Sequence, residues 1–346
     1  TLAVIHQKTN KMIPTYNDLA SKEQYFKIIK IDSLVDFKVF FDEHKSEKKG
    51  IYRGINNAKY KIFTTLQREK LLGNLSANFS LENYISNFRT KPLIKKYFET
   101  ININLSKISV LSFLQHHKTP TPLIDFTTNV EIALFFAIEK MIGNPWTNSI
   151  NEIDNYFSVF HISEEDTKLI NIEQVIVGIE KMKNQWDEII FDKVKHDSLL
   201  LNHIDQMTDI GTMDVYLVNL ENKFKSFSTL NNIRILSQDG LFIHNTFGDD
   251  PLEKALKEFF IPATQFVGSE MDDMENIPQV KKANVEYINQ LEINSNNQKK
   301  LNQNIIISYE INKSLIPEIA KQMKIDADFI YPDFDKLCMA TFTETK

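Results

Sequence analysis

Residues 114–137 read LQHHKTPTPLIDFTTNVEIALFFA, and this stretch decides the fold that the sequence predicts. Pro120 and Pro122 end a helix that we expect over residues 108–117, because proline lacks a backbone donor and clashes with the preceding helical turn. A second helix is expected over residues 129–142, where apolar side chains repeat at helical spacing. The polar residues between the two helices are thereby held at one rigid turn, which favours a functional role for them.

The elements outside this stretch predict a sheet flanked by helices. Apolar and β-branched runs indicate strands at 50–54, 156–162, 214–218 and 305–311, and two extended pieces around a turn at 233–236 and 241–244. Apolar residues at helical spacing indicate further helices at 32–41, 81–98 and 314–323. Because strands and helices do not alternate regularly, we expect an α+β fold with a mixed or antiparallel sheet core and flanking helices.

Composition narrows the class of protein. The 346 residues include 42% hydrophobic and 25% charged residues, which is typical of a folded globular chain. A net charge of −6 argues against a protein whose main role is to coat nucleic acid, although it leaves room for a local basic groove. The single cysteine, Cys338, excludes a disulfide scaffold and a cysteine-based zinc site. With no apolar run near ~18 residues and no signal-peptide pattern, we expect a cytoplasmic protein with no membrane partner.

Several common catalytic motifs are missing from the sequence, which contains no HExxH, no P-loop, no GxSxG and no GxGxxG. Three polar clusters remain as candidates. The first is Tyr52-Arg53-Gly54, in which an arginine at a strand end can bind a phosphate or carboxylate through its planar guanidinium. The alternative is a surface arginine beside a turn glycine.

The second cluster lies in the stretch quoted above. His116 can exchange protons near neutral pH and Asp125 can supply a charge, or His116 is simply a core histidine bonded to Asp125. Thr127, Thr128 or Asn129 can supply the N-cap of the following helix, and Thr128 with Glu131 resembles a capping box, so the alternative role of Thr128 is that of a helix cap alone. The third cluster is Gln238 before a glycine, which either presents an amide to a cleft or belongs to a hairpin turn.

Taken in order, these motifs resemble the FRG domain family, named for its Phe/Tyr-Arg-Gly signature. The matching patterns are YRG at 52–54, QHH-x-x-PTPLIDFTTN-x-x-x-ALFFA at 115–137, R-x-x-x-Q-x-G-x-F at 234–242 and YPDFD at 331–335. The resemblance implies one domain over residues 31–346, preceded by an arm at 1–30 and interrupted by insertions near 140–155 and 165–230. Members of this family look like cytoplasmic bacterial or phage proteins, often effectors of a defence or toxin type.

A weaker resemblance is to ADP-ribosyltransferases of the Arg-Ser-Glu type, and it implies NAD as a substrate. By this likeness Arg53 holds an NAD phosphate, Thr127 and Thr128 shape the nicotinamide ribose pocket, and His116 orients a ribose hydroxyl. The chain departs from that pattern because it contains no Glu-x-Glu. Gln238 stands where the glutamate is expected but carries no charge, so Asp125 is the candidate for the missing carboxylate.

Three functions follow as hypotheses. The first is an NAD-using ADP-ribosyltransferase-like enzyme that binds a nucleotide and modifies nucleic acid or protein. The second is a nucleic-acid hydrolase with His116 as general base and Asp125 as its partner. The third is a non-catalytic module that binds a ligand or partner. For the first hypothesis the catalytic candidates are His116, Asp125 and Gln238, and the cofactor-binding candidates are Tyr52, Arg53, Gly54, Gln115, Thr121, Thr127 and Thr128.

Overall fold

A computed structural model of the chain describes residues 11–45, 49–144, 146–170, 215–218, 231, 233–258 and 304–333. Its centre is a seven-stranded sheet with strand order β1-β7-β4-β2-β3-β6-β5. The β1–β7 pair is parallel and the other pairs are antiparallel, so the predicted α+β fold with a mixed sheet is confirmed. The strands are β1 (Lys27–Ile31), β2 (Gly50–Ile55), β3 (Leu123–Thr127), β4 (Tyr156–Ser163), β5 (Val215–Val218), β6 (Gly240–Asn245) and β7 (Ile306–Asn312).

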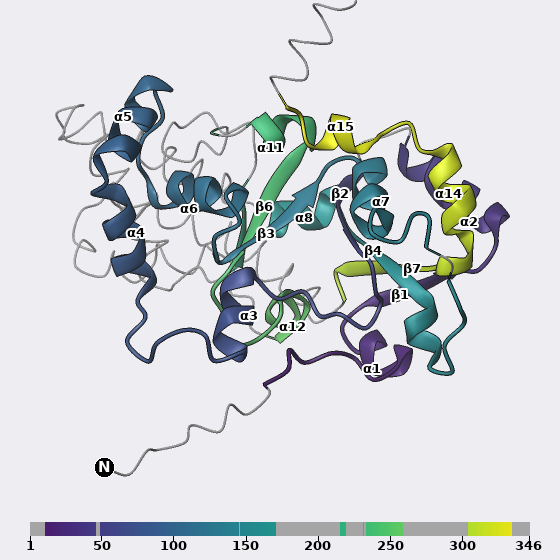
Figure 1. Cartoon of the computed structure of the whole chain (residues 1–346). Coiled ribbons are helices and arrows are strands. Elements are labelled where there is room, and N and C mark those ends of the chain that lie inside the picture. Colours follow the sequence, from purple (N-terminus) through teal and green to yellow (C-terminus); the bar gives the residue numbers. More distant parts are fainter. Residues whose placement is uncertain are drawn as a thin grey trace, which may run out of the picture.

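Helices cover both faces of this sheet (Figure 1). One face packs against α2 (Leu34–Lys45), α7 (Val130–Ile138) and α14 (Ile316–Gln322). The other packs against α1 (Leu19–Glu23), α8 (Glu164–Ile170) and α12 (Leu252–Glu258). The remaining helical segments are α3 (Thr65–Leu71), α4 (Leu81–Arg89), α5 (Pro92–Thr100), α6 (Lys107–His116), α11 (Ile233–Ser237), α15 (Ala327–Ile330) and the short 3-10 turns at Glu152–Asn155 and Lys313–Leu315.

The order α6–β3–α7 follows from the stretch that opened the sequence analysis. Pro120 and Pro122 follow the end of α6, as predicted, whereas the strand β3 after them was not predicted. The α7 helix is almost wholly apolar and buried, and Asn129 caps its first turn by accepting a hydrogen bond from the Glu131 amide at 2.9 Å. The cap is therefore Asn129, and the predicted capping box at Thr128 is not formed.

Three sequence-based expectations differ from the structure. The helix predicted over 81–98 is two helices, because the residue before Pro92 is restricted to extended backbone and α4 ends at Arg89. Residues 233–236, predicted as extended, lie in α11. Part of the predicted arm is integrated into the fold, since β1 pairs with β7 and Tyr16 is buried, its hydroxyl bonded to Glu253 at 2.6 Å. The insertion predicted near 165–230 falls largely outside the described residues.

Candidate active site

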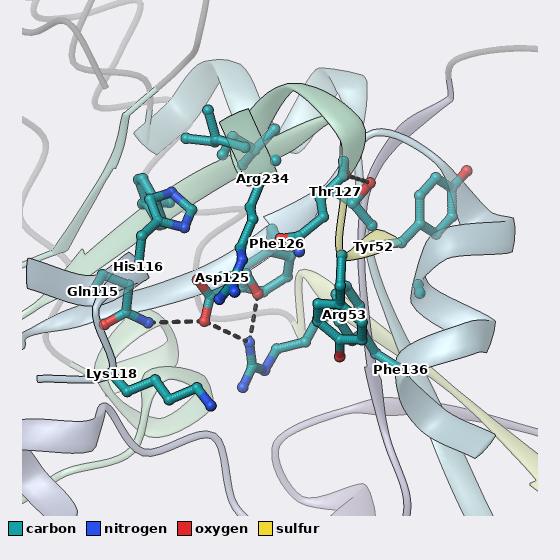
Figure 2. Close-up of a pocket in the computed structure, with 18 residues that line it drawn as sticks. Tyr52, Arg53, Gln115, His116, Lys118, Asp125, Phe126, Thr127, Phe136 and Arg234 are labelled. Carbon is teal, nitrogen blue, oxygen red and sulfur yellow. Dashed lines mark hydrogen bonds and ion pairs between the residues drawn. The ribbon is translucent and has the colours of Figure 1, made fainter. Parts of the chain in front are cut away.

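A cavity of about 320 Å³ lies where strands β2 and β3 stop pairing. The β2 strand pairs with β4 along its whole length, but with β3 only at Tyr52–Thr127. Residues from β2, α6, β3, α7, α11 and β6 line the cavity, together with Lys118 after α6 and Tyr331 after α15 (Figure 2). Its volume is at the lower end of the range of roughly 300–1,000 Å³ found for small-molecule sites.

Two features of β2 shape this opening. A Cβ atom on Gly54 would lie 1.8 Å from the carbonyl oxygen of Ala133, so only glycine lets α7 approach β2 this closely. Beside it, Arg53 extends its guanidinium to β3, where Nη1 donates to the backbone oxygen of Asp125 at 2.5 Å. The arginine side chain thus bridges the strands where their backbone pairing has ended.

The Asp125 carboxylate is held in place by a short chain of hydrogen bonds. Gln115 Nε2 donates to Asp125 Oδ2 at 2.8 Å, and the Thr121 hydroxyl donates to the Gln115 oxygen. Arg53 Nη1 lies 3.9 Å from the same Oδ2. Because the Asp125 side chain is 54% exposed, its carboxylate is oriented by protein groups and still open to a ligand.

His116 lines the cavity as a neutral imidazole. Burial lowers its pKa, and the charges of His117 and Arg234 lower it further, while Asp125 opposes them. The ring packs edge-on against Phe242, with centroids 5.6 Å apart. Within the described residues its buried Nε2 has no hydrogen-bond partner, and Asp125 bonds to Gln115 instead. The alternative in which His116 is a core histidine bonded to Asp125 is therefore not what the structure shows.

Gln238 and Thr127 connect β3 to α11 and to the end of α15. Gln238 Nε2 donates to the carbonyl oxygen of Ile330 at 3.2 Å, and the Gln238 carbonyl accepts a bond from the Thr127 hydroxyl at 2.8 Å. That hydroxyl also accepts from the Asn129 amide at 3.1 Å. Gln238 lies at the cavity wall, but its amide is engaged in holding the segment that carries Tyr331.

The structure brings most of the predicted site residues together. Thr121 and Thr128 do not line the cavity: Thr121 is fully buried and orients Gln115, while Thr128 lies at the start of α7. The catalytic and binding roles of the set stay predictions. The predicted residues that do line the cavity are Tyr52, Arg53, Gly54, Gln115, His116, Asp125, Thr127 and Gln238.

Positive charge gathers at this cavity. Arg53, Lys118 and Arg234 line it, whereas Asp125 is the only acidic residue among the lining residues described. Arg68 on α3 lies near enough for its charge to act on Arg53, and the charge of Asp125 in turn acts on Arg68. Burial lowers the pKa of Arg53, Arg68 lowers it further and Asp125 opposes this. An anionic ligand would relieve the excess charge.

The positive charge near the cavity comes largely from arginine, which is rare in this chain. The chain has 40 Lys and Arg residues in total, of which only four are arginine, and three of these are Arg53, Arg68 and Arg234. Arginine is favoured where a planar fork of donors must bind phosphate or carboxylate. Our sequence prediction missed Arg234, Lys118, Phe136 and Tyr331 as lining residues. Two of them had a signal in the sequence. Arg234 is one of only four arginines and begins the motif at 234–242, and Tyr331 begins the motif at 331–335.

A buried pair of histidines, which do not line the cavity, contacts Tyr52. His44 Nδ1 is 2.9 Å from the Tyr52 hydroxyl, and His44 Nε2 is 2.9 Å from the Tyr309 hydroxyl. The His161 ring stacks on Tyr52 at a centroid distance of 4.8 Å. Burial, and then the neighbouring His161, lower the pKa of His44 from 6.5 to about 4. Tyr52, which reaches the cavity, thus rests on two neutral histidines.

This pair makes folding stability sensitive to acid. Between about pH 6.5 and 4 the unfolded chain binds a proton at His44 that the folded chain does not, so stability falls as pH falls through that window. We expect His44 to contribute about 2 kcal/mol of lost stability between pH 7 and pH 5. Denaturant unfolding at the two pH values measures it. His44→Gln should flatten the dependence and the exposed His117→Gln should not; equal slopes in all three proteins would refute this assignment.

None of the described helices is both long and apolar enough to cross a membrane. No curated protein and no solved structure matches the chain. A family model described as the FRG domain matches residues 48–144, which include β2, α3, α6, β3 and α7 and hence Arg53, Gln115, His116 and Asp125. The FRG resemblance is thereby confirmed for the motifs at 52–54 and 115–137, and the chain contains an FRG domain match whose residues build one side of this cavity.

Proposed function

We propose that the FRG domain binds NAD in this cavity and transfers its ADP-ribosyl group to a nucleic-acid or protein acceptor. The observation that carries the proposal is the meeting of Arg53 and Asp125 where β2 and β3 stop pairing, inside a cavity with excess positive charge. We further propose that the protein acts in the cytoplasm as a bacterial or phage effector of defence or toxin type, a proposal that the FRG resemblance supports.

Arg53 suits the phosphate-binding role in this proposal. A guanidinium has five N–H donors, and the Arg53 side chain uses Nη1 to reach Asp125. Its side chain is 20% exposed, so an ion pair formed here would be partly shielded from water and stronger than one at the surface. The remaining donors support bidentate binding of a phosphate.

Asp125 suits the role of the carboxylate that such transferases require. In the transfer, the bond between ribose C1′ and the nicotinamide nitrogen breaks, and its electron pair leaves with neutral nicotinamide. Positive charge develops on the ribose and is stabilised by the Asp125 carboxylate. An acceptor oxygen or nitrogen then attacks C1′ and loses its proton to solvent or to a neutral base such as His116.

The geometry gives less support to hydrolysis by a His116–Asp125 pair. That mechanism needs Asp125 to orient the imidazole, but Asp125 bonds to Gln115 and the His116 Nε2 atom is buried. A non-catalytic binding module would keep the cavity and its charge but show no turnover, so the experiment below separates it from a transferase.

Replacing Arg53 tests the proposal directly. Arg53→Lys keeps the charge but loses the planar fork, so we expect NAD binding to weaken by about tenfold or more, and nicotinamide release to fall with it. Calorimetry and a nicotinamide assay measure the two. Arg89→Lys is the matched control, because Arg89 ends helix α4 and does not line the cavity. Unchanged binding in Arg53→Lys, or no NAD binding by folded wild type, would contradict the proposal.

A further inference from the structure

Lys118 occupies a backbone position that normally suits glycine. The α6 helix ends at His116, and Lys118 has a φ of 58°, in the left-handed region. The amide of Thr119 donates to the carbonyl of Leu114 at 3.1 Å and the Lys118 amide to that of Gln115 at 3.1 Å. This is the Schellman ending of a helix, in which glycine is preferred because a side chain strains the backbone.

Another helix of the chain ends in the same way with a more suitable residue. After α5, Asn102 has a φ of 56°, and the Ile103 amide donates to the carbonyl of Phe98 at 3.0 Å. Asparagine is the residue that best tolerates this conformation after glycine. Lysine does not favour this backbone conformation, so we infer that a lysine stands at position 118 because of its side chain.

The Lys118 side chain is directed into the cavity. It lines the wall and, within the described residues, makes no hydrogen bond or ion pair. In Figure 2 it runs from the end of α6 toward the guanidinium of Arg53. A strained backbone therefore carries an unpartnered ammonium group on the side of the cavity facing Arg53.

Arg234 adds a third cation to the cavity lining. Against Arg53, Lys118 and Arg234 stands one carboxylate among the described lining residues, that of Asp125. The lining thus has two positive charges more than it has negative ones. One phosphate diester would neutralise only one of them, whereas a diphosphate diester carries two negative charges.

We propose that Lys118 binds the second phosphate of a diphosphate whose first phosphate lies on Arg53, so that the cavity selects diphosphates over monophosphates. This inference deepens the proposed function, on which the identification of NAD as the diphosphate rests. Lys118 is then a specificity-determining residue, and its strained backbone is retained for the charge that it carries.

The test compares ADP with AMP, and inorganic pyrophosphate with phosphate, by calorimetry on the full chain. Wild type should prefer each diphosphate. Lys118→Gly should weaken ADP binding by about fivefold and AMP binding by less than about twofold, because it removes the ion pair to the second phosphate, which AMP lacks. It should also raise Tm by about 1–2 °C by relieving strain. Asn102→Gly is the matched control, with unchanged binding, and Lys118→Asn removes the charge while still tolerating the turn.

Equal losses for ADP and AMP in Lys118→Gly and Lys118→Asn, unchanged ADP binding, or a wild type without preference for diphosphates would overturn the inference. Its failure is distinguishable from that of the proposed function. If Lys118 confers the preference for ADP but NAD yields no nicotinamide, the diphosphate site stands and the transfer reaction does not. If NAD yields nicotinamide but the protein shows no preference for ADP, the transfer reaction stands and the diphosphate site does not.

Discussion

Replacing Glu310 with glutamine should lower the free energy of unfolding by about 3–5 kcal/mol. Lys22 Nζ lies 2.6 Å from Glu310 Oε1, and both side chains are completely buried between the sheet and α1. Lys22 also donates to the Ala58 carbonyl and the Ser158 hydroxyl, each at 2.9 Å. Burial lowers the pKa of Lys22 and the charge of Glu310 opposes this, so the variant leaves an ammonium without its counter-charge. Denaturant unfolding at neutral pH measures the loss.

An exposed pair of the same residue types provides the control. Lys30 Nζ lies 2.5 Å from Glu152 Oε1, but the two side chains are 43% and 60% exposed. Glu152→Gln should therefore change stability by less than about 1 kcal/mol. Replacing both buried partners, in Lys22→Met with Glu310→Leu, should recover much of the loss because no unpaired charge remains. Equal losses of stability in Glu310→Gln and Glu152→Gln would contradict the claim that burial makes the Lys22–Glu310 pair more costly to break.

The second large effect is expected on catalysis. Asp125→Asn should reduce nicotinamide release from NAD by about 10²–10⁴-fold, because it removes the charge that stabilises the developing cation on the ribose. Stability should change little, since Asp125 is half exposed and an asparagine oxygen can still accept the hydrogen bond from Gln115. A turnover assay together with thermal unfolding separates the two effects.

Asp249→Asn is the matched control for this variant. Asp249 is 55% exposed and pairs with Lys70 at 2.8 Å, so it resembles Asp125 in exposure and in having a cationic partner, but it does not line the cavity. We expect Asp249→Asn to keep full activity. Turnover by Asp125→Asn at the wild-type rate would remove Asp125 from the reaction.

Much of the fold could be predicted from local sequence signals. The prolines at 120 and 122 separate α6 from β3, and strong apolar patterns place α7, β4 and β7. The errors occurred where tertiary context decides. Residues 233–236 are apolar and β-branched enough to indicate a strand, yet they form one helical turn against the end of β6. The β2–β3 opening depends on long-range packing at Gly54, which no local pattern reveals.

The candidate site could be predicted only in part, because some of its contacts also depend on tertiary packing. Arg53, His116 and Asp125 fall in recognisable motifs, and they do line one cavity. The partner of Asp125 was not predictable, because the Thr121–Gln115 chain depends on how the turn after α6 folds back. The left-handed backbone at Lys118 also became visible only in three dimensions, since its residue type gives no sign of it.

The most direct test of the central claim is transfer of isotopically labelled NAD. Purified wild type and Asp125→Asn are incubated with whole-cell lysate and NAD labelled in its ADP-ribose part, and the protein, RNA and DNA fractions are counted. The account predicts that wild type labels one of these fractions and that Asp125→Asn, although folded, does not. Absence of both label transfer and nicotinamide release with folded wild type, or equal transfer by Asp125→Asn, would contradict it.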